Sequence, residues 1–128
     1  MRNPAQVYQN QSITTANPGE LTLMLYNGGI KFLKQAQLAL KDNQINEAHE
    51  LIMKVQDIVQ ELMISLNVDI PISEEFMRLY DFMHHRLVEA NMKKDAGLLE
   101  EVEYFFVQFR DTWKETMLKA KQHEVSKV

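Results

Sequence analysis

The sequence predicts an all-α protein, folded as an antiparallel up-down bundle of four helices. Apolar residues recur every three to four positions along most of the 128 residues, which is the spacing of one helix face. The few Gly and Pro residues, 4 and 3 in number, stand mostly at the ends of these periodic segments. No alternating strand pattern of useful length lies between them, and the short joints favour antiparallel neighbours.

The first expected helix covers residues 18–41. Asn17 is a favoured N-cap residue, Pro18 suits the first helical position, and Glu20 stands where a capping-box carboxylate reaches back. Asp42 and Asn43 break the pattern. Within this helix, Gly28-Gly29 costs roughly 1 kcal/mol per Gly, so we interpret the pair as a place where a neighbouring helix packs closely.

The second expected helix covers residues 44–67, and residues 68–72 connect it to the third, because Pro71 cannot continue a helix. The expected inward side chains of the second helix are Ala48, Leu51, Ile52, Val55, Ile58, Val59, Leu62 and Leu66.

Ser73 is the expected N-cap of the third helix, with Glu74 and Glu75 placed well for the helix dipole. Lys93 and Lys94 end it, and Asp95 caps the fourth helix. The expected inward side chains of these two helices are Phe76, Leu79, Tyr80, Met83, Leu87 and Ala90, then Leu98, Leu99, Val102, Phe105, Phe106, Phe109 and Trp113.

Residues 17–119 are therefore expected to form one bundle domain. Residues 1–16 are rich in Asn, Gln and Thr, with Tyr8 and Ile13 among their few large apolar side chains. We expect them to form a mobile lid segment, and residues 120–128 to form a frayed polar tail.

Composition narrows the function classes. The chain has no Cys and a formal net charge of -4, which fits a reducing cytoplasm and argues against a nucleic-acid surface. No apolar run approaches the roughly 18 residues of a membrane span, and the first residues have no signal-peptide pattern. We expect a cytoplasmic protein without a cofactor.

The predicted helices carry more apolar residues than one buried stripe needs. The first helix has two rows at helical spacing, and one of them comprises Leu23, Tyr26, Ile30 and Leu33. Other apolar residues lie outside the inward arcs, and a contiguous exposed patch usually marks a partner site. The expected partner-binding residues are Tyr8, Ile13, Leu23, Tyr26, Ile30, Leu33, Met53, Ile64 and Val107.

Catalytic and metal-binding patterns are weak. His84 and His85 point about 100° apart on a helix, and the inward positions hold no carboxylate for a metal site. No Gly-rich phosphate loop, nucleophile elbow or zinc motif occurs, so we expect no enzyme and no metal. One alternative is histidine phosphotransfer on His49, although Glu47 and Glu50 would repel a phosphoryl group. The other is a generic helical adaptor.

Several blocks of the chain resemble one known family, the bacterial flagellar secretion chaperones of the FliS type. The matching blocks occur in order over nearly the whole chain and cover residues 13–21, 24–28, 56–62, 65–67, 79–83, 86–91, 94–95, 100–102 and 113–115.

The resemblance implies a cytoplasmic, non-enzymatic chaperone with a four-helix bundle fold. Such proteins bind the disordered C-terminal segment of flagellin, prevent its premature polymerisation and help deliver it to the flagellar type III export apparatus. Their N-terminal segment is thought to act as a displaceable lid. An export-gate component and other flagellar regulators are further partners that the resemblance suggests.

Overall fold

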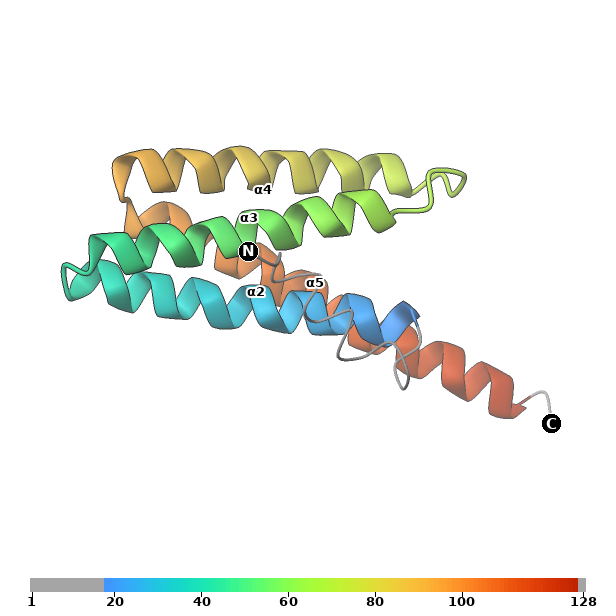
Figure 1. Ribbon diagram of the computed structural model, residues 1–128. Helices are drawn as coiled ribbons and strands as arrows, with labels where there is room; N and C mark the ends of the chain where they lie inside the picture. The colour runs from blue at the N-terminus through green and yellow to red at the C-terminus, as the bar shows by residue number, and fades with distance from the viewer. Residues whose placement is uncertain (1–17, 127–128) are drawn as a thin grey trace.

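The computed structural model describes residues 18–126, and these residues form four α-helices (Figure 1). The helices are α2 (Pro18–Lys41), α3 (Ile45–Ser65), α4 (Ser73–Lys93) and α5 (Ala96–Ser126). The predicted all-α class and element order are confirmed. The expected N-cap at Asn17 and the expected mobility of residues 1–16 lie outside the described residues.

Successive helices run in opposite directions and pack in a ring (Figure 1). α2 and α4 each pack against both α3 and α5. Within the described part of the chain, α2 and α4 therefore lie diagonally across the bundle, as do α3 and α5. This is the predicted up-down bundle, and it brings the start of α2, the end of α3 and the start of α4 to one end of the molecule.

A continuous apolar core fills the space between the helices. The expected inward row of α3 is confirmed, since seven of its eight residues are buried and Leu66 is half-buried. Leu79 of α4 was expected inside but is exposed, because the inward row of α4 follows Tyr80, Met83, Leu87 and Ala90, about 100° further round the helix. The largest fully buried side chains are Phe106, Leu33, Ile52, Ile58, Leu62, Met83, Leu87 and Leu99.

Gly29 explains how closely α2 and α5 approach each other. A Cβ atom added to Gly29 would lie 1.9 Å from Cε2 of Phe106, whose side chain is fully buried. The ring of Phe106 therefore sits directly over the backbone of α2 at this point. The expectation that the Gly pair serves close packing of a neighbouring helix is confirmed at Gly29.

Two short turns join α2 to α3 and α4 to α5. Each contains a residue in the left-handed region, Asn43 with φ 57° and Lys94 with φ 52°. In each turn the next amide closes the preceding helix, since Gln44 N donates to Ala39 O at 2.8 Å and Asp95 N donates to Ala90 O at 3.0 Å. These are the bonds of a Schellman-type helix end.

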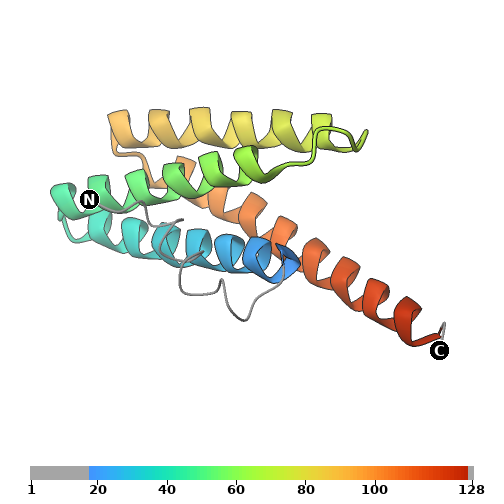
Figure 2. The same cartoon turned by 45° about the vertical axis from the view of Figure 1, so that its right-hand side comes forward.

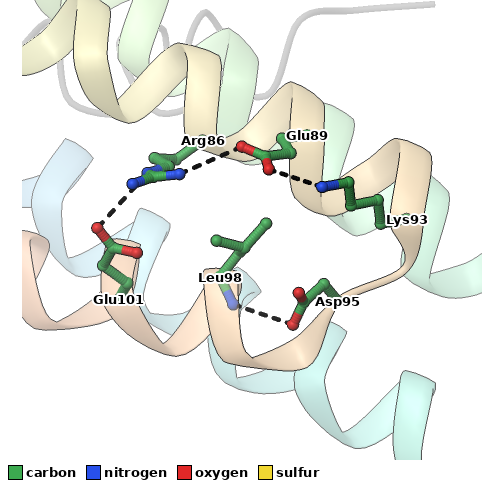
Figure 3. Close-up of polar contacts among 6 residues, drawn as sticks. All are labelled: Arg86, Glu89, Lys93, Asp95, Leu98 and Glu101. Atoms are coloured by element: carbon green, nitrogen blue, oxygen red, sulfur yellow. Dashed lines mark hydrogen bonds and ion pairs between the residues drawn. The ribbon is translucent and has the colours of Figure 1, made fainter.

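The two expected side-chain caps differ in outcome. Asp95 caps α5 as predicted, because its Oδ1 accepts a hydrogen bond from the backbone N–H group of Gly97 at 2.9 Å. The same oxygen accepts a bond from the backbone N–H group of Leu98 at 3.4 Å (Figure 3). Ser73 was wrong as the cap of α4. The cap position is Ile72, which provides no side-chain bond, and Ser73 is a buried residue of the helix itself.

Charged side chains join α4 to α5 near this turn (Figure 3). Glu89 accepts hydrogen bonds from Lys93 Nζ at 3.0 Å and from Arg86 Nη1 at 3.2 Å. Both partners lower the pKa of the Glu89 carboxyl group, and Lys93 has the larger effect. Arg86 Nε also lies 3.6 Å from Glu101 Oε1 on α5. Pairs this exposed contribute little stability, and of these three pairs the one between Arg86 and Glu101 crosses from α4 to α5.

α5 is longer than the expected bundle domain and continues as a helix to Ser126. It runs on past the start of α2 and away from α4 (Figure 2). Whether residues 120–128 form a frayed tail stays a prediction. Lys119, Ala120, Lys121 and Gln122 are good helix formers, which favours the continuation of the helix past residue 119.

Candidate partner-binding surface

The apolar row expected to be surplus on the first helix lies mostly inside the bundle. Tyr26, Ile30 and Leu33 are buried, and only Leu23 is half-buried. The reason is that α2 packs against two helices, α3 and α5, so both of its apolar rows are covered. The expectation that this row forms an exposed surface is therefore wrong for these three residues. Whether they contribute to partner binding stays a prediction.

The remaining expected residues do not gather in one patch. Met53 and Ile64 are exposed and lie on different parts of α3, Met53 facing α4 and Ile64 near the connector to α4. Val107 is half-buried and packs against the core. Tyr8 and Ile13 lie outside the described residues.

A groove lies between the first turns of α2 and the last turns of α5, and we call it the α2–α5 groove. Its volume is about 600 Å³. Of the residues expected to bind a partner, Leu23 lines this groove. The full lining is Gly19, Glu20, Leu23, Lys114, Met117, Leu118, Ala120 and Lys121. Its lining is mostly apolar, and its two lysines, Lys114 and Lys121, both come from α5.

A second hollow, the aromatic cavity, lies beside the connector between α3 and α4 and has a volume of about 330 Å³. Its walls come from all four helices and the connector. They include Thr22, Tyr26, Leu62, Leu66, Ile70, Ile72, Phe76, Tyr80 and Trp113.

Two hydrogen bonds fix the aromatic cavity. The hydroxyl oxygens of Tyr26 and Tyr80 are 2.6 Å apart and share one hydrogen bond across the bundle. Burial raises the pKa of both tyrosines. Trp113 Nε1 donates to the carbonyl oxygen of Gly19 at 2.8 Å, which ties α5 to the first turn of α2. Phe109 stacks on Tyr26 with a centroid distance of 5.8 Å.

Gly19 lines both the α2–α5 groove and the aromatic cavity. Both hollows therefore open at the place where the described part of the chain begins. A segment that precedes Pro18 in the chain has a short path to either one. This is the strongest structural reason to connect the N-terminal residues with partner binding.

The connector between α3 and α4 adds apolar surface that the sequence reasoning missed. Ile64 was expected to be exposed, and it is 78% exposed, while the neighbouring Val68 is 75% exposed. We call Ile64, Val68, Ile70 and Ile72 the apolar corner. The sequence does contain a signal for this surface. Val68, Ile70 and Ile72 lie around Pro71, where a loop usually has Gly, Asn, Asp or Ser.

His49 of α3 contacts a residue of α4, whereas His85 contacts the preceding turn of its own helix. The His49 Nδ1 atom lies 3.1 Å from Asn91 Oδ1, and the His85 Nδ1 atom lies 2.8 Å from the carbonyl oxygen of Asp81. Among residues 18–126, no group of three His, Asp or Glu side chains could hold a metal ion. Phosphotransfer on His49 stays an untested alternative. None of the helices in this range is long and apolar enough to cross a membrane.

Comparison with known proteins gives one consistent result. The family model described as flagellar protein FliS matches residues 1–121. The chain is similar to the flagellar secretion chaperone FliS of Bacillus subtilis, with 45% identity over 91% of this chain and 88% of that protein. It is also similar to FliS of Salmonella typhimurium, with 31% identity over 94% of this chain and 91% of that protein.

A solved structure supports the fold. A crystal structure of a bacterial flagellar chaperone superposes with a TM-score of 0.76 and covers 89% of this chain and 94% of its own. Its identity to this chain is 21%. At that identity the likeness concerns the arrangement of the helices.

Proposed function

We propose that this chain, which belongs to the FliS family of flagellar proteins, is a chaperone for the C-terminal segment of flagellin. In this proposal it acts in the cytoplasm and holds the segment before assembly. It thereby prevents premature polymerisation and delivers flagellin to the flagellar type III export apparatus. It acts by binding and not by catalysis.

The observation that carries the proposal is the α2–α5 groove together with the adjoining aromatic cavity. An amphipathic client helix needs an apolar channel that the host's own core leaves uncovered. Met117 and Leu118 of α5 supply such a channel beside Leu23 of α2. The aromatic cavity next to it has room for an apolar side chain and offers buried hydroxyl groups.

The client would contact further exposed apolar residues on its way round the bundle. Ile64 and Met53 are both exposed on α3, at different heights along that helix. The two residues are eleven positions apart, which is about three helical turns, so a client segment laid along α3 could reach both. Val107 is the expected contact on α5, and Tyr26 bounds the aromatic cavity from inside.

We further propose that residues 1–16 act as a removable lid. An uncovered apolar groove on a soluble protein promotes aggregation. Tyr8 and Ile13 provide two large apolar side chains close in sequence to Gly19, where both hollows open. The client would displace this segment, so that apolar side chains of the client replace those of the lid in the groove.

Binding would order a client that is disordered on its own. Such coupled folding commonly buries about 1,000 to 3,000 Å² and costs several kcal/mol of ordering. The affinity should therefore depend weakly on salt and show a negative heat-capacity change. Further partners in flagellar export, including an export-gate component and flagellar regulators, would meet the loaded complex.

Trp113 makes a direct test possible, because it is the single Trp of the chain and lines the aromatic cavity. We expect its fluorescence to change when the flagellin segment is added, with an endpoint at one segment per chain. Leu118→Ser should weaken binding at least tenfold. A matched control is Leu38→Ser on α2, because Leu38 is 60% exposed and Leu118 is 61% exposed.

If both variants bind as the unaltered chain does, the α2–α5 groove is not the client site. If both lose binding equally, the effect is not specific to the groove. Either result would contradict the placement of the client proposed here.

A further inference from the structure

A third hollow, the α3–α4 cleft, lies between the first turns of α3 and the last turns of α4 and has a volume of about 350 Å³. It is at the end of the bundle opposite to the connector between α3 and α4 (Figure 1). Its lining is His49, Met53, Gln56, Val88, Asn91, Met92 and Lys94. One imidazole and two thioether sulfur atoms therefore line the same small cleft.

The geometry of the two helices directs the thioethers of Met53 and Met92 toward each other. α3 and α4 are antiparallel neighbours (Figure 1), and the contact between His49 and Asn91 fixes their register. Met53 follows His49 by one turn and so lies about level with Val88. Side chains of a helix lean toward its N-terminus. Met53 therefore leans toward the turn of His49, and Met92 leans back toward the turn of Val88.

The ring of His49 is held by the facing helix. Its Nδ1 atom lies 3.1 Å from Oδ1 and 3.0 Å from Nδ2 of the Asn91 amide. Lys94 Nζ in turn donates to Oδ1 of Asn91 and, at 2.7 Å, to its carbonyl oxygen. With the ring proton on Nδ1, donated to Oδ1, the lone pair of Nε2 is left for a metal. A histidine ligand is commonly oriented by such a bond from its other ring nitrogen.

Imidazole and thioether groups together form a soft set of metal ligands. Thioether sulfur selects Cu(I) among the biological metals, and the chain has no Cys whose thiolate would compete for it. We propose that His49, Met53 and Met92 bind one Cu(I) ion, or the chemically similar Ag(I), in the α3–α4 cleft. The expectation of a protein without a metal came from its His and carboxylate patterns, and thioether sulfur is a different class of ligand.

The charges of the cleft favour a monovalent ion. The ammonium group of Lys94 lies in the lining and repels a divalent cation twice as strongly as a monovalent one. The seven lining residues include no carboxylate that would offset this repulsion. The cleft is therefore a poor site for Zn²⁺, which binds through thiolate, imidazole and carboxylate ligands. A bound Cu(I) would connect α3 to α4 and stabilise the folded chain.

Nuclear magnetic resonance of the full chain, without client and with carbon-13 in the methionine methyl groups, tests the proposal. Silver nitrate in a chloride-free buffer is the probe. The signals of Met53 and Met92 should move together and saturate at one Ag(I) per chain. The signal of Met77, which lies four turns before Met92 on α4, should stay in place. Zinc nitrate should move none of the three signals.

Substitutions at the ligands provide the second readout. Met53→Leu and Met92→Leu remove the sulfur atom and nearly keep the side-chain volume. Each should weaken Ag(I) binding by roughly tenfold or more, as should His49→Ala, because even outer partners of a metal site commonly contribute about 10- to 100-fold. The matched controls are Met77→Leu and His85→Ala on α4, which should bind as the unaltered chain does.

The same variants, titrated anaerobically with Cu(I) in ascorbate against a chromogenic Cu(I) chelator, should keep this order of affinities. If the signals of all methionines move alike, or if the leucine variants at the cleft bind as the unaltered chain does, the proposal is wrong. A chain that does not withdraw Cu(I) from the chelator would also overturn it. Met53 is an expected client contact as well. Because these measurements contain no client, their outcome does not depend on the proposed chaperone function.

Discussion

The hydroxyl groups of Tyr26 and Tyr80 meet at 2.6 Å, and this single hydrogen bond joins helices on opposite corners of the bundle. Both side chains are buried, and both border the aromatic cavity. The bond thus links α2 directly to α4 at the end where we place partner binding. The two hydroxyl groups bond to each other, so removal of one hydroxyl leaves the other buried without this hydrogen bond.

A double-mutant cycle on this pair should show strong coupling. Tyr26→Phe and Tyr80→Phe should each lower the free energy of unfolding by about 1 to 3 kcal/mol, because each leaves one buried hydroxyl without its partner. The double variant should cost less than the sum by about 1 kcal/mol. Urea denaturation of the four proteins measures this, and additive losses would mean that the bond contributes nothing of its own.

The same pair predicts how stability depends on pH in alkaline solution. Burial raises the pKa of both tyrosines above 10.0, the value expected when they are unfolded. Below pH 10 both states hold the protons, so this contribution to stability is fully present. Above about pH 10 the unfolded chain ionises first, and stability falls as the pH rises.

The control for this pH dependence is the variant with Phe at both positions. Its free energy of unfolding should fall less between pH 9.5 and about pH 11.5 than that of the unaltered chain. Equal slopes for the two proteins would show that other groups cause the alkaline loss.

Gly29 is expected to tolerate no side chain. In Gly29→Ala the new methyl group would overlap the buried ring of Phe106, and relief of such overlap costs about 1 to 3 kcal/mol. Asn27→Ala, at an exposed position two residues away, should change little. Thermal unfolding measures both, and adding Phe106→Leu to Gly29→Ala should recover part of the loss. Equal melting temperatures for Gly29→Ala and the unaltered chain would contradict this packing.

Much of the bundle could be predicted because helical spacing and helix breaks are local properties. The inward row of α3 and the cap at Asp95 were predictable for this reason. Ser73 shows the limit, because a cap depends on where the connector turns. The chain already enters the helix at Ile72, so Ser73 became part of the buried first turn.

The partner surface was harder to predict, because exposure depends on how many neighbours a helix has. Two apolar rows on α2 suggested an uncovered face, yet α3 and α5 cover both rows, including Tyr26 and Leu33. The α2–α5 groove arises where α5 passes the first turns of α2, so that Met117 and Leu118 line it together with Leu23. Spacing within one helix contains no information on which residues of another helix lie beside it.

The lid proposal predicts a specific result for the N-terminal residues. Tyr8→Ala with Ile13→Ala should change the affinity for the flagellin segment by several-fold while leaving the melting temperature of the bundle nearly unchanged. The reason is that a lid competes with the client without belonging to the core. Fluorescence titration and thermal unfolding measure the two quantities. A large fall in melting temperature would place these residues in the core instead.

Calorimetric titration of the full chain with the C-terminal segment of flagellin from the same organism, at several temperatures, tests the central claim most directly. The chaperone proposal predicts tight one-to-one binding with a large negative heat-capacity change, because apolar surface is buried as the client folds. Absence of binding at any temperature would contradict it, and histidine phosphotransfer on His49 would then be the next hypothesis to test.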